Sequence, residues 1–516
     1  MLTILTFSPL IGVLLLLLVP KDRLPIIRGI GVATTLIPLI LALFSYGSST
    51  TELHNWISIP LNLEAIGQVP GWTFEIQYHL SLDGISLPLV LMTTVVAAMA
   101  AIASFTIKNR AKTYYILFLL LEIGMLGVFM ARDLFLFFAF FEWTLVPTFF
   151  MIGIWGLANR EKAANRFLVY NGLGSALMLV AFGIMTVTFG FDQSQETGRL
   201  IYSGNIDLII NHLKDANSLV NNMNNPFYLS EGWRMFAFVL LVIAFGIKLP
   251  IFPFHTWMLR VHEEAPAPVV MLHSGILLKM GAYGLIQFGI VLLPVQAAAW
   301  TTALAILGII NIVYGAVLAF AQKEFRLVLA YSSISHMGFV LFGIAAMNEI
   351  GLQGAVLQMV SHGFISALFF LLVGALQQRT GTTRLDDLGG LAKSMPFISA
   401  LLLIAGLASL GLPGLSGFPA ELFSLLGLFD TMPWAAIIGA LGVILSAVYV
   451  LRAILRITYG EQAERHAHLQ DARLYEAIPA ILLTACILLI GIYPSIVTNS
   501  IDNGIKHIIE ILQVRG

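Results

Sequence analysis

Apolar runs of about 20 residues recur along the whole chain, separated by shorter polar stretches. As a helix, a run of this length crosses the roughly 30 Å hydrocarbon core of a bilayer. The pattern therefore predicts an all-α integral membrane protein with about 14 transmembrane helices. The predicted spans are approximately 2–19, 28–46, 84–106, 113–131, 134–156, 167–190, 234–252, 267–292, 297–320, 326–347, 353–377, 396–428, 434–458 and 476–498.

Two of these spans are interrupted by helix-breaking residues. One contains Lys248-Leu249-Pro250 and the other contains Pro413-Gly414. Proline removes a backbone donor, and freed backbone groups at membrane depth must line a cavity or be buried in protein. Paired broken helices are typical of transporters with inverted repeats. Ordinary proline kinks are the alternative.

The breaks suggest how the chain is divided. Two five-helix units each carry the break in their fourth span, so we expect two inverted five-helix repeats. The expected divisions are residues 1–112 with helices 1–3 and an outer loop, 113–292 with helices 4–8, 297–458 with helices 9–13, and 459–516 with the last span and a short tail.

Composition and charge agree with a membrane protein. The 516 residues are 58% hydrophobic and 11% charged, whereas soluble domains carry roughly 25% charged residues. One set of alternate loops holds 19 of the 27 Lys and Arg residues and the other set with the tail holds 6, while Lys248 and Lys279 lie within spans. The positive-inside rule then places both termini and the long loops 47–83 and 191–233 outside. A net charge of −1 suggests no nucleic-acid partner.

Both ends of the chain have distinct patterns. The first apolar stretch has no preceding positive charge and no small-residue cleavage site, so we interpret it as a retained span. The tail places Ile501, Ile505, Ile508 and Leu512 on one helical face. This predicts a short interfacial helix, and a frayed end is the alternative. The loop 191–233 is polar, contains NNMNNP and is predicted to be irregular.

Seven ionisable side chains inside the predicted spans stand out. An ionised group at the bilayer centre costs on the order of 3 kcal/mol or more, so each indicates a function by default. The alternative is that they are buried pairs or satisfied polar groups that only hold helices together. The seven are Glu122, Glu142, Lys248, Lys279, His336, His362 and Glu421.

Such groups can carry protons. Burial disfavours the charged form, a Lys–Glu pair keeps both partners charged, and separating the pair lets the lysine release its proton. Ser274, Ser335 and Ser361 lie near these groups in the sequence and are expected to hold water between them.

Several motifs resemble those of one protein family. GIKLPIFPFHTW, HEEAPAPV, LLKMGAYG, YSSISHMGF, SHGFISALFFL and GLPGLSGF are similar to motifs of the antiporter-like subunits of NADH–quinone oxidoreductase (complex I) and of multisubunit cation/proton antiporters. The resemblance extends over about residues 85–460. It implies a subunit that carries protons across the membrane while electrons move elsewhere in the complex.

The resemblance also implies roles for single residues. Glu142 is similar to the acid that pairs with the lysine of the broken seventh span, here Lys248. Lys279 resembles the connecting lysine, His336 and His362 resemble the histidines of the central axis, and Glu421 resembles the terminal ionisable group. Glu122 resembles a further acid near the boundary with a neighbouring subunit.

Glu421 distinguishes branches of the family. The L and N subunits and the antiporter D subunits have lysine at this position, and the M subunits have glutamate. Only about 18 residues follow the last span, whereas an L subunit adds a long lateral helix. The segments MLRVHEEAPAP and Pro419-Ala420 depart from the usual family pattern, which leaves the local geometry of the second break open.

The resulting expectation is a proton-translocating membrane-arm subunit, an enzyme only as part of NADH:quinone oxidoreductase. Its partners are other membrane-arm subunits on both sides, lipid and protons, and its location is a bacterial cytoplasmic membrane. We expect no cofactor, metal or redox centre, because the single Cys486 cannot replace the roughly four cysteines of an iron–sulfur cluster and no nucleotide motif is present.

Three other functions are compatible with the sequence. The chain could be a subunit of a Na⁺/H⁺ antiporter or membrane-bound hydrogenase, a structural spacer that conducts nothing, or a free-standing solute carrier. The last is weakest, because the sequence indicates no substrate pocket.

Overall fold

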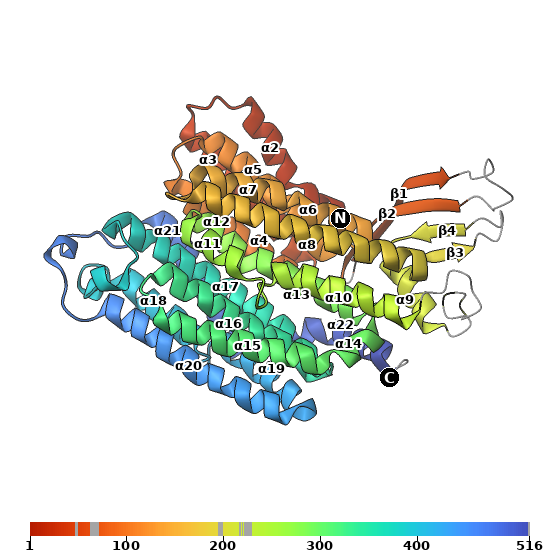
Figure 1. Cartoon of the computed structure of the whole chain (residues 1–516). Helices are drawn as coiled ribbons and strands as arrows, with labels where there is room; N and C mark the ends of the chain where they lie inside the picture. The colour runs from red at the N-terminus through yellow and green to blue at the C-terminus, as the bar shows by residue number, and fades with distance from the viewer. Residues whose placement is uncertain are drawn as a thin grey trace.

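The computed structural model describes residues 1–46, 50–61, 72–193, 200–215, 218, 220 and 230–513. Long helices run side by side along the molecule, and four strands lie at one end (Figure 1). The helices of the first half are α1 (Leu2–Phe7), α2 (Pro9–Leu18), α3 (Leu24–Phe44), α4 (Ser86–Ala103), α5 (Ala111–Met130), α6 (Leu134–Trp143), α7 (Leu145–Trp155), α8 (Arg160–Phe189), α9 (Ile206–Lys214), α10 (Glu231–Lys248) and α11 (Thr256–Glu264).

The second half continues the bundle. Its helices are α12 (Ala267–Leu272), α13 (Leu278–Gly284), α14 (Pro294–Ala299), α15 (Thr301–Ala321), α16 (Phe325–Ala346), α17 (Glu349–Thr380), α18 (Pro396–Ser409), α19 (Gly417–Thr431), α20 (Pro433–Thr458), α21 (Leu474–Ile492) and α22 (Ser495–Gln513). The strands are β1 (Thr50–Leu61), β2 (Trp72–Leu82), β3 (Phe191–Gln193) and β4 (Leu200–Ser203).

The predicted class of fold, an all-α membrane protein, is confirmed. Within the described residues, eleven helices are long and apolar enough to cross a membrane, and Leu2–Leu18 and Pro396–Ser409 are shorter apolar helices. Each predicted span overlaps one helix or a consecutive pair of helices. The predictions of fourteen crossings, of two inverted repeats and of the four divisions of the chain stay predictions.

Both predicted breaks separate helices. α10 ends at Lys248 and α11 begins at Thr256, while α18 ends at Ser409 and α19 begins at Gly417. Gly411 and Gly414 in the second break have φ angles of +75° and +93°, which glycine adopts without the steric strain of a side chain. Between the two breaks, π-helical turns at His273–Leu277 and Leu285–Ile290 flank α13.

The long loops contain more regular structure than the sequence predicted. β1 pairs antiparallel with β2, β2 pairs parallel with β4, and β4 pairs antiparallel with β3, which joins both loops in one sheet. The prediction that 191–233 is irregular is wrong for its described part, since β3, β4 and α9 lie there. The NNMNNP segment lies outside the described residues.

The tail forms a helix that packs on the bundle. Ile501, Ile505 and Ile508 of α22 are buried, so a frayed end is wrong for the described tail. Leu512 is partly buried against the same core. A position at the membrane surface stays a prediction.

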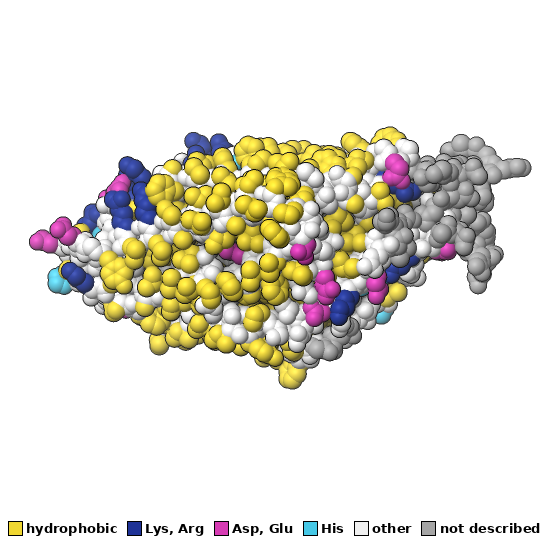
Figure 2. Space-filling model, turned by 90° about the horizontal axis from the view of Figure 1, so that it is seen from below, with side chains coloured by type: hydrophobic (Ala, Val, Ile, Leu, Met, Phe, Trp, Pro, Cys, Tyr) yellow, Lys and Arg dark blue, Asp and Glu magenta, His cyan; other side chains and the backbone are white. Residues whose placement is uncertain are grey.

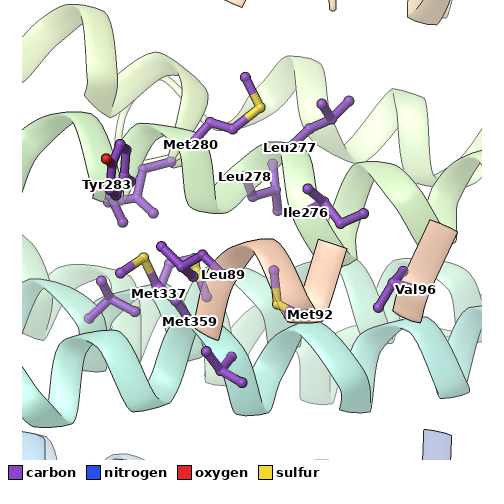
Figure 3. Packing of buried hydrophobic residues seen from close by; sticks show 14 of the residues in the cluster. Leu89, Met92, Val96, Ile276, Leu277, Leu278, Met280, Tyr283, Met337 and Met359 are labelled. Atoms are coloured by element: carbon purple, nitrogen blue, oxygen red, sulfur yellow. The ribbon is translucent and has the colours of Figure 1, made fainter. Parts of the chain in front are cut away.

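The surface and core have the pattern expected in lipid. Hydrophobic side chains cover most of the face of the bundle that Figure 2 shows, and Lys and Arg gather at the end opposite the sheet. Ile437, Leu441 and Ile444 of α20 are 61%, 54% and 63% exposed, and contiguous exposed apolar surface of this kind marks contact with a membrane or a partner. Inside, side chains of α4, α13, α16 and α17 meet in one apolar layer (Figure 3).

Candidate functional site

The centre of the bundle contains a lysine bonded to a histidine. Lys279 of α13 is completely buried. Its ammonium Nζ lies 2.7 Å from Nδ1 of His362 on α17 and also donates to the carbonyl oxygen of Ser274. The π-helical turn over residues 273–277 precedes Lys279, and such turns are frequent at functional sites.

A second histidine and a glutamate continue this contact. The rings of His362 and His336 are 5.4 Å apart between centroids. His336 Nδ1 lies 3.2 Å from Oε1 of Glu421, and its Nε2 lies 2.9 Å from Oγ of Ser409. Lys279, His362, His336 and Glu421 therefore form one row of contacts across four helices, which we name the polar axis.

Tight helix packing holds this row together. A Cβ atom on Gly354 of α17 would lie 2.3 Å from the backbone nitrogen of Ser424 on α19. The missing side chain thus lets the helix of His362 approach the helix of Glu421. Because α19 begins at Gly417, after the break, Glu421 lies in its first two turns, facing His336.

A small polar cavity adjoins the axis. It has a volume of about 10 Å³ and is lined by polar groups and rings that include Ser332, Ser333, His336, His362 and Ser409. This is close to the space that one water molecule needs. Of the serines predicted to hold water, Ser335 donates to the Ile312 carbonyl, Ser361 donates to Ser416, and Ser274 lies 3.3 Å from Ser333. That they hold water stays a prediction.

Lys248 is buried at the end of α10, apart from its expected partner. Its ammonium lies 4.8 Å from the ring centroid of Phe141 and 5.7 Å from that of Phe167. Lys248 and Glu142 both belong to the described residues, and no ion pair within 4.0 Å joins them. Glu142 is half-buried, and its Oε1 has no hydrogen-bond partner among the residues that the structure describes. The expected ion pair is therefore open in this structure.

Glu122 of α5 stands apart from the axis. It is completely buried, and neither carboxylate oxygen has a hydrogen-bond partner within the described part of the chain. Its side chain is thus not on the surface of the subunit, although the resemblance places the corresponding acid near a neighbouring subunit.

The sequence analysis missed a second pair of buried histidines. His262 Nε2 lies 3.0 Å from Nδ1 of His273, and both rings are completely buried. The Phe167 ring is 6.0 Å from His273 and also lies beside the Lys248 ammonium. His273 sits six residues before Lys279 in the same apolar run, and that position was the available signal.

These features define a class of protein: a polytopic helical bundle with two broken helices and a row of lysine, histidine and glutamate through its apolar core, as in antiporter-like membrane subunits. Residues 131–447 match the family described as "NADH:quinone oxidoreductase/Mrp antiporter, TM". The chain belongs to this family.

Curated relatives are similar in sequence to most of the chain. It is 37% identical over 513 residues to NAD(P)H-quinone oxidoreductase chain 4 2 of Thermosynechococcus vestitus, covering 97% of this chain and 90% of the relative. It is 41% identical over 447 residues to chain 4 1 of Synechococcus elongatus, covering 85% of this chain and 79% of the relative.

Solved structures share the fold. A chain of respiratory complex I from Thermus thermophilus with bound NADH is 29% identical with a TM-score of 0.82, covering 99% of this chain and 100% of that one. A chain of the archaeal membrane-bound sulfane sulfur reductase is 27% identical with a TM-score of 0.78, covering 96% and 77%. A chain of the Mrp complex from Dietzia is 20% identical with a TM-score of 0.79, covering 100% and 99%, a likeness of fold alone.

Proposed function

We propose that this chain is a proton-translocating subunit in the membrane arm of an NADH–quinone oxidoreductase, of the M type. The polar axis is the observation that carries the proposal. Lys279, His362, His336 and Glu421 contact one another in this order through the core of the bundle. Lys279–His362 and His336–Glu421 lie at hydrogen-bond distances, and the cavity of about 10 Å³ that both histidines line has room for about one water. A proton can pass along such a row where lipid excludes bulk water.

The proposed path begins on the inner side. A proton resides on Lys248 or Lys279, crosses the two histidines and leaves outward through the Glu421 region. The proposed switch for proton transfer is the formation and separation of the Glu142–Lys248 ion pair. The position of Lys248 over the Phe141 ring, without an ion pair to Glu142, supports an open state of this switch.

Electron transfer belongs to other subunits in this proposal, since this sequence has one cysteine. Partner subunits of the membrane arm flank the chain on both sides, in a bacterial cytoplasmic membrane with both termini outside. The gathering of Lys and Arg at the end opposite the sheet supports this orientation.

The alternative is a subunit of a multisubunit Na⁺/H⁺ antiporter or membrane-bound hydrogenase. A subunit of such an antiporter would have the same fold, since the Mrp chain from Dietzia has it. Curated relatives named NAD(P)H-quinone oxidoreductase chain 4 favour the first proposal. Identifying the subunits that co-purify with the chain separates the two.

Substitution of Lys279 tests the proposal directly. In the intact complex, reconstituted in vesicles, Lys279→Ala should abolish proton uptake driven by NADH oxidation and strongly reduce quinone reduction. The matched control is Lys323→Ala, whose side chain is 72% exposed and should retain both activities. Full pumping by an assembled Lys279→Ala complex would favour a structural spacer instead.

A further inference from the structure

A second cavity lies on the other side of α17 from the polar axis. It has a volume of about 350 Å³ and is formed by α3, α4, α17, α21 and α22. Val95 of α4, Val360 and Phe364 of α17, and Cys486 and Leu489 of α21 are among its lining residues. Its size falls in the roughly 300–1,000 Å³ range of pockets that hold small molecules.

The cavity offers nothing to a polar ligand. Its two side-chain hydroxyl groups are already bonded inside the protein, since Tyr46 donates to the Ile496 carbonyl at 2.7 Å and Ser500 donates to the Val497 carbonyl at 2.8 Å. The remaining lining side chains are apolar. Apolar cavities of this kind stay free of water, so a suitable occupant is a hydrocarbon.

Exposed residues at the rim of the cavity indicate that a hydrocarbon enters it from the bilayer. Leu43 of α3 and Leu489 of α21 line the cavity and are 58% and 50% exposed. These helices meet the bilayer, so the cavity opens sideways to lipid. At the end near the sheet, the Tyr46–Ile496 hydrogen bond connects the end of α3 to the start of α22.

That hydrogen bond distinguishes two apolar occupants. A transmembrane helix of a neighbouring subunit needs an unobstructed length of roughly 30 Å, and the Tyr46–Ile496 connection obstructs the outer end. A lipid chain enters from the side and bends. We propose that this cavity is a binding site for an acyl chain of a membrane phospholipid, held between α3, α4, α17 and α21.

The bound chain touches the helix that carries the polar axis. Val360 and Phe364 are one turn apart on the face of α17 that lines the cavity, and His362 lies about 200° around the helix from Val360. On the same helix a Cβ atom on Gly363 would lie 2.1 Å from Sδ of Met92, another lining residue on α4 (Figure 3). The acyl chain therefore fills the space behind the α4–α17 contact.

A photoreactive phospholipid tests the site without measuring proton transport. The intact complex is reconstituted with phosphatidylglycerol that carries a diazirine near the middle of one acyl chain, and cross-linked peptides are identified by mass spectrometry. We expect cross-links on the α17 peptide containing Val360 and Phe364 and on the α21 peptide containing Cys486. Their absence would overturn the proposal.

Variants that fill the cavity give the decisive comparison. Cys486→Trp and Val95→Phe should each reduce the α17 cross-link several-fold, because the larger side chain occupies the space of the acyl chain. The matched control is Leu488→Trp, since Leu488 is 39% exposed to lipid and does not line the cavity. Equal α17 cross-linking in the fillers and the control would overturn the proposal. Recovery of a quinone or a partner-subunit peptide in this cavity, instead of lipid, would also overturn the proposal.

Discussion

Replacing His362 with leucine removes the central link of the polar axis while keeping a side chain of similar bulk. In the present structure this imidazole accepts from Lys279 at 2.7 Å and faces the His336 ring at 5.4 Å between centroids. In the His362→Leu variant, the Ser274 carbonyl is the one hydrogen-bond partner that Lys279 keeps among the described residues. We expect proton translocation through this subunit to stop.

The structure sets the size of the effect. Proton transfer needs groups within about 2.6–3.2 Å of each other, or one intervening water. The adjoining cavity of about 10 Å³ has room for on the order of one water, and leucine offers it no partner. Losing a positioned proton carrier lowers a transfer rate by roughly 10²–10⁴-fold. Losing the hydrogen bond of a charged group costs about 1.5–3 kcal/mol of stability.

The assay measures quinone reduction and proton uptake together in vesicles that contain the intact complex, with assembly checked on a native gel. His468→Leu, at an exposed histidine, is the matched control and should change neither activity. His362→Gln keeps an acceptor for Lys279 but cannot relay a proton, so it should restore assembly and not pumping. Normal pumping by either assembled His362 variant would refute the relay.

Three further predictions concern the switch, an ion pair and a helix contact. Glu142→Ala or Lys248→Ala should abolish pumping and strongly reduce quinone reduction, because either change removes one partner of the proposed switch. Arg379→Ala should lower the melting temperature of the purified complex, since the buried Glu476 carboxylate, 2.6 Å from Arg379, would lose its charged partner. Gly354→Ala should reduce pumping by displacing α19, since its Cβ would meet the α19 backbone at 2.3 Å.

Each of these three predictions has a control variant or a result that would contradict it. Full pumping by both switch variants would contradict the switch. Arg465→Ala, at a side chain that is 63% exposed, should leave the melting temperature nearly unchanged, and an equal loss would contradict the buried-pair argument. Gly183→Ala, where an added Cβ meets no atom within 4 Å, should be tolerated, and unimpaired pumping by Gly354→Ala would contradict the packing argument.

The sequence alone determined the class of fold and seven of the ionisable groups inside the spans. Membrane spans are visible in it because transfer into lipid depends on the local run of side chains. The charges inside those spans are visible for the same reason, since each is an exception to an apolar run. The two breaks were visible because proline and glycine act on the backbone where they stand.

Only the tertiary structure decided which of these groups touch. Lys279 and His362 are 83 residues apart in the chain, and the open Glu142–Lys248 pair, the His262–His273 pair and the sheet that joins both long loops were not predicted. Such contacts depend on how closely two helices or strands approach. That approach is set by glycine contacts, π-helical turns and strand pairing between distant segments, and a hydropathy pattern records none of these.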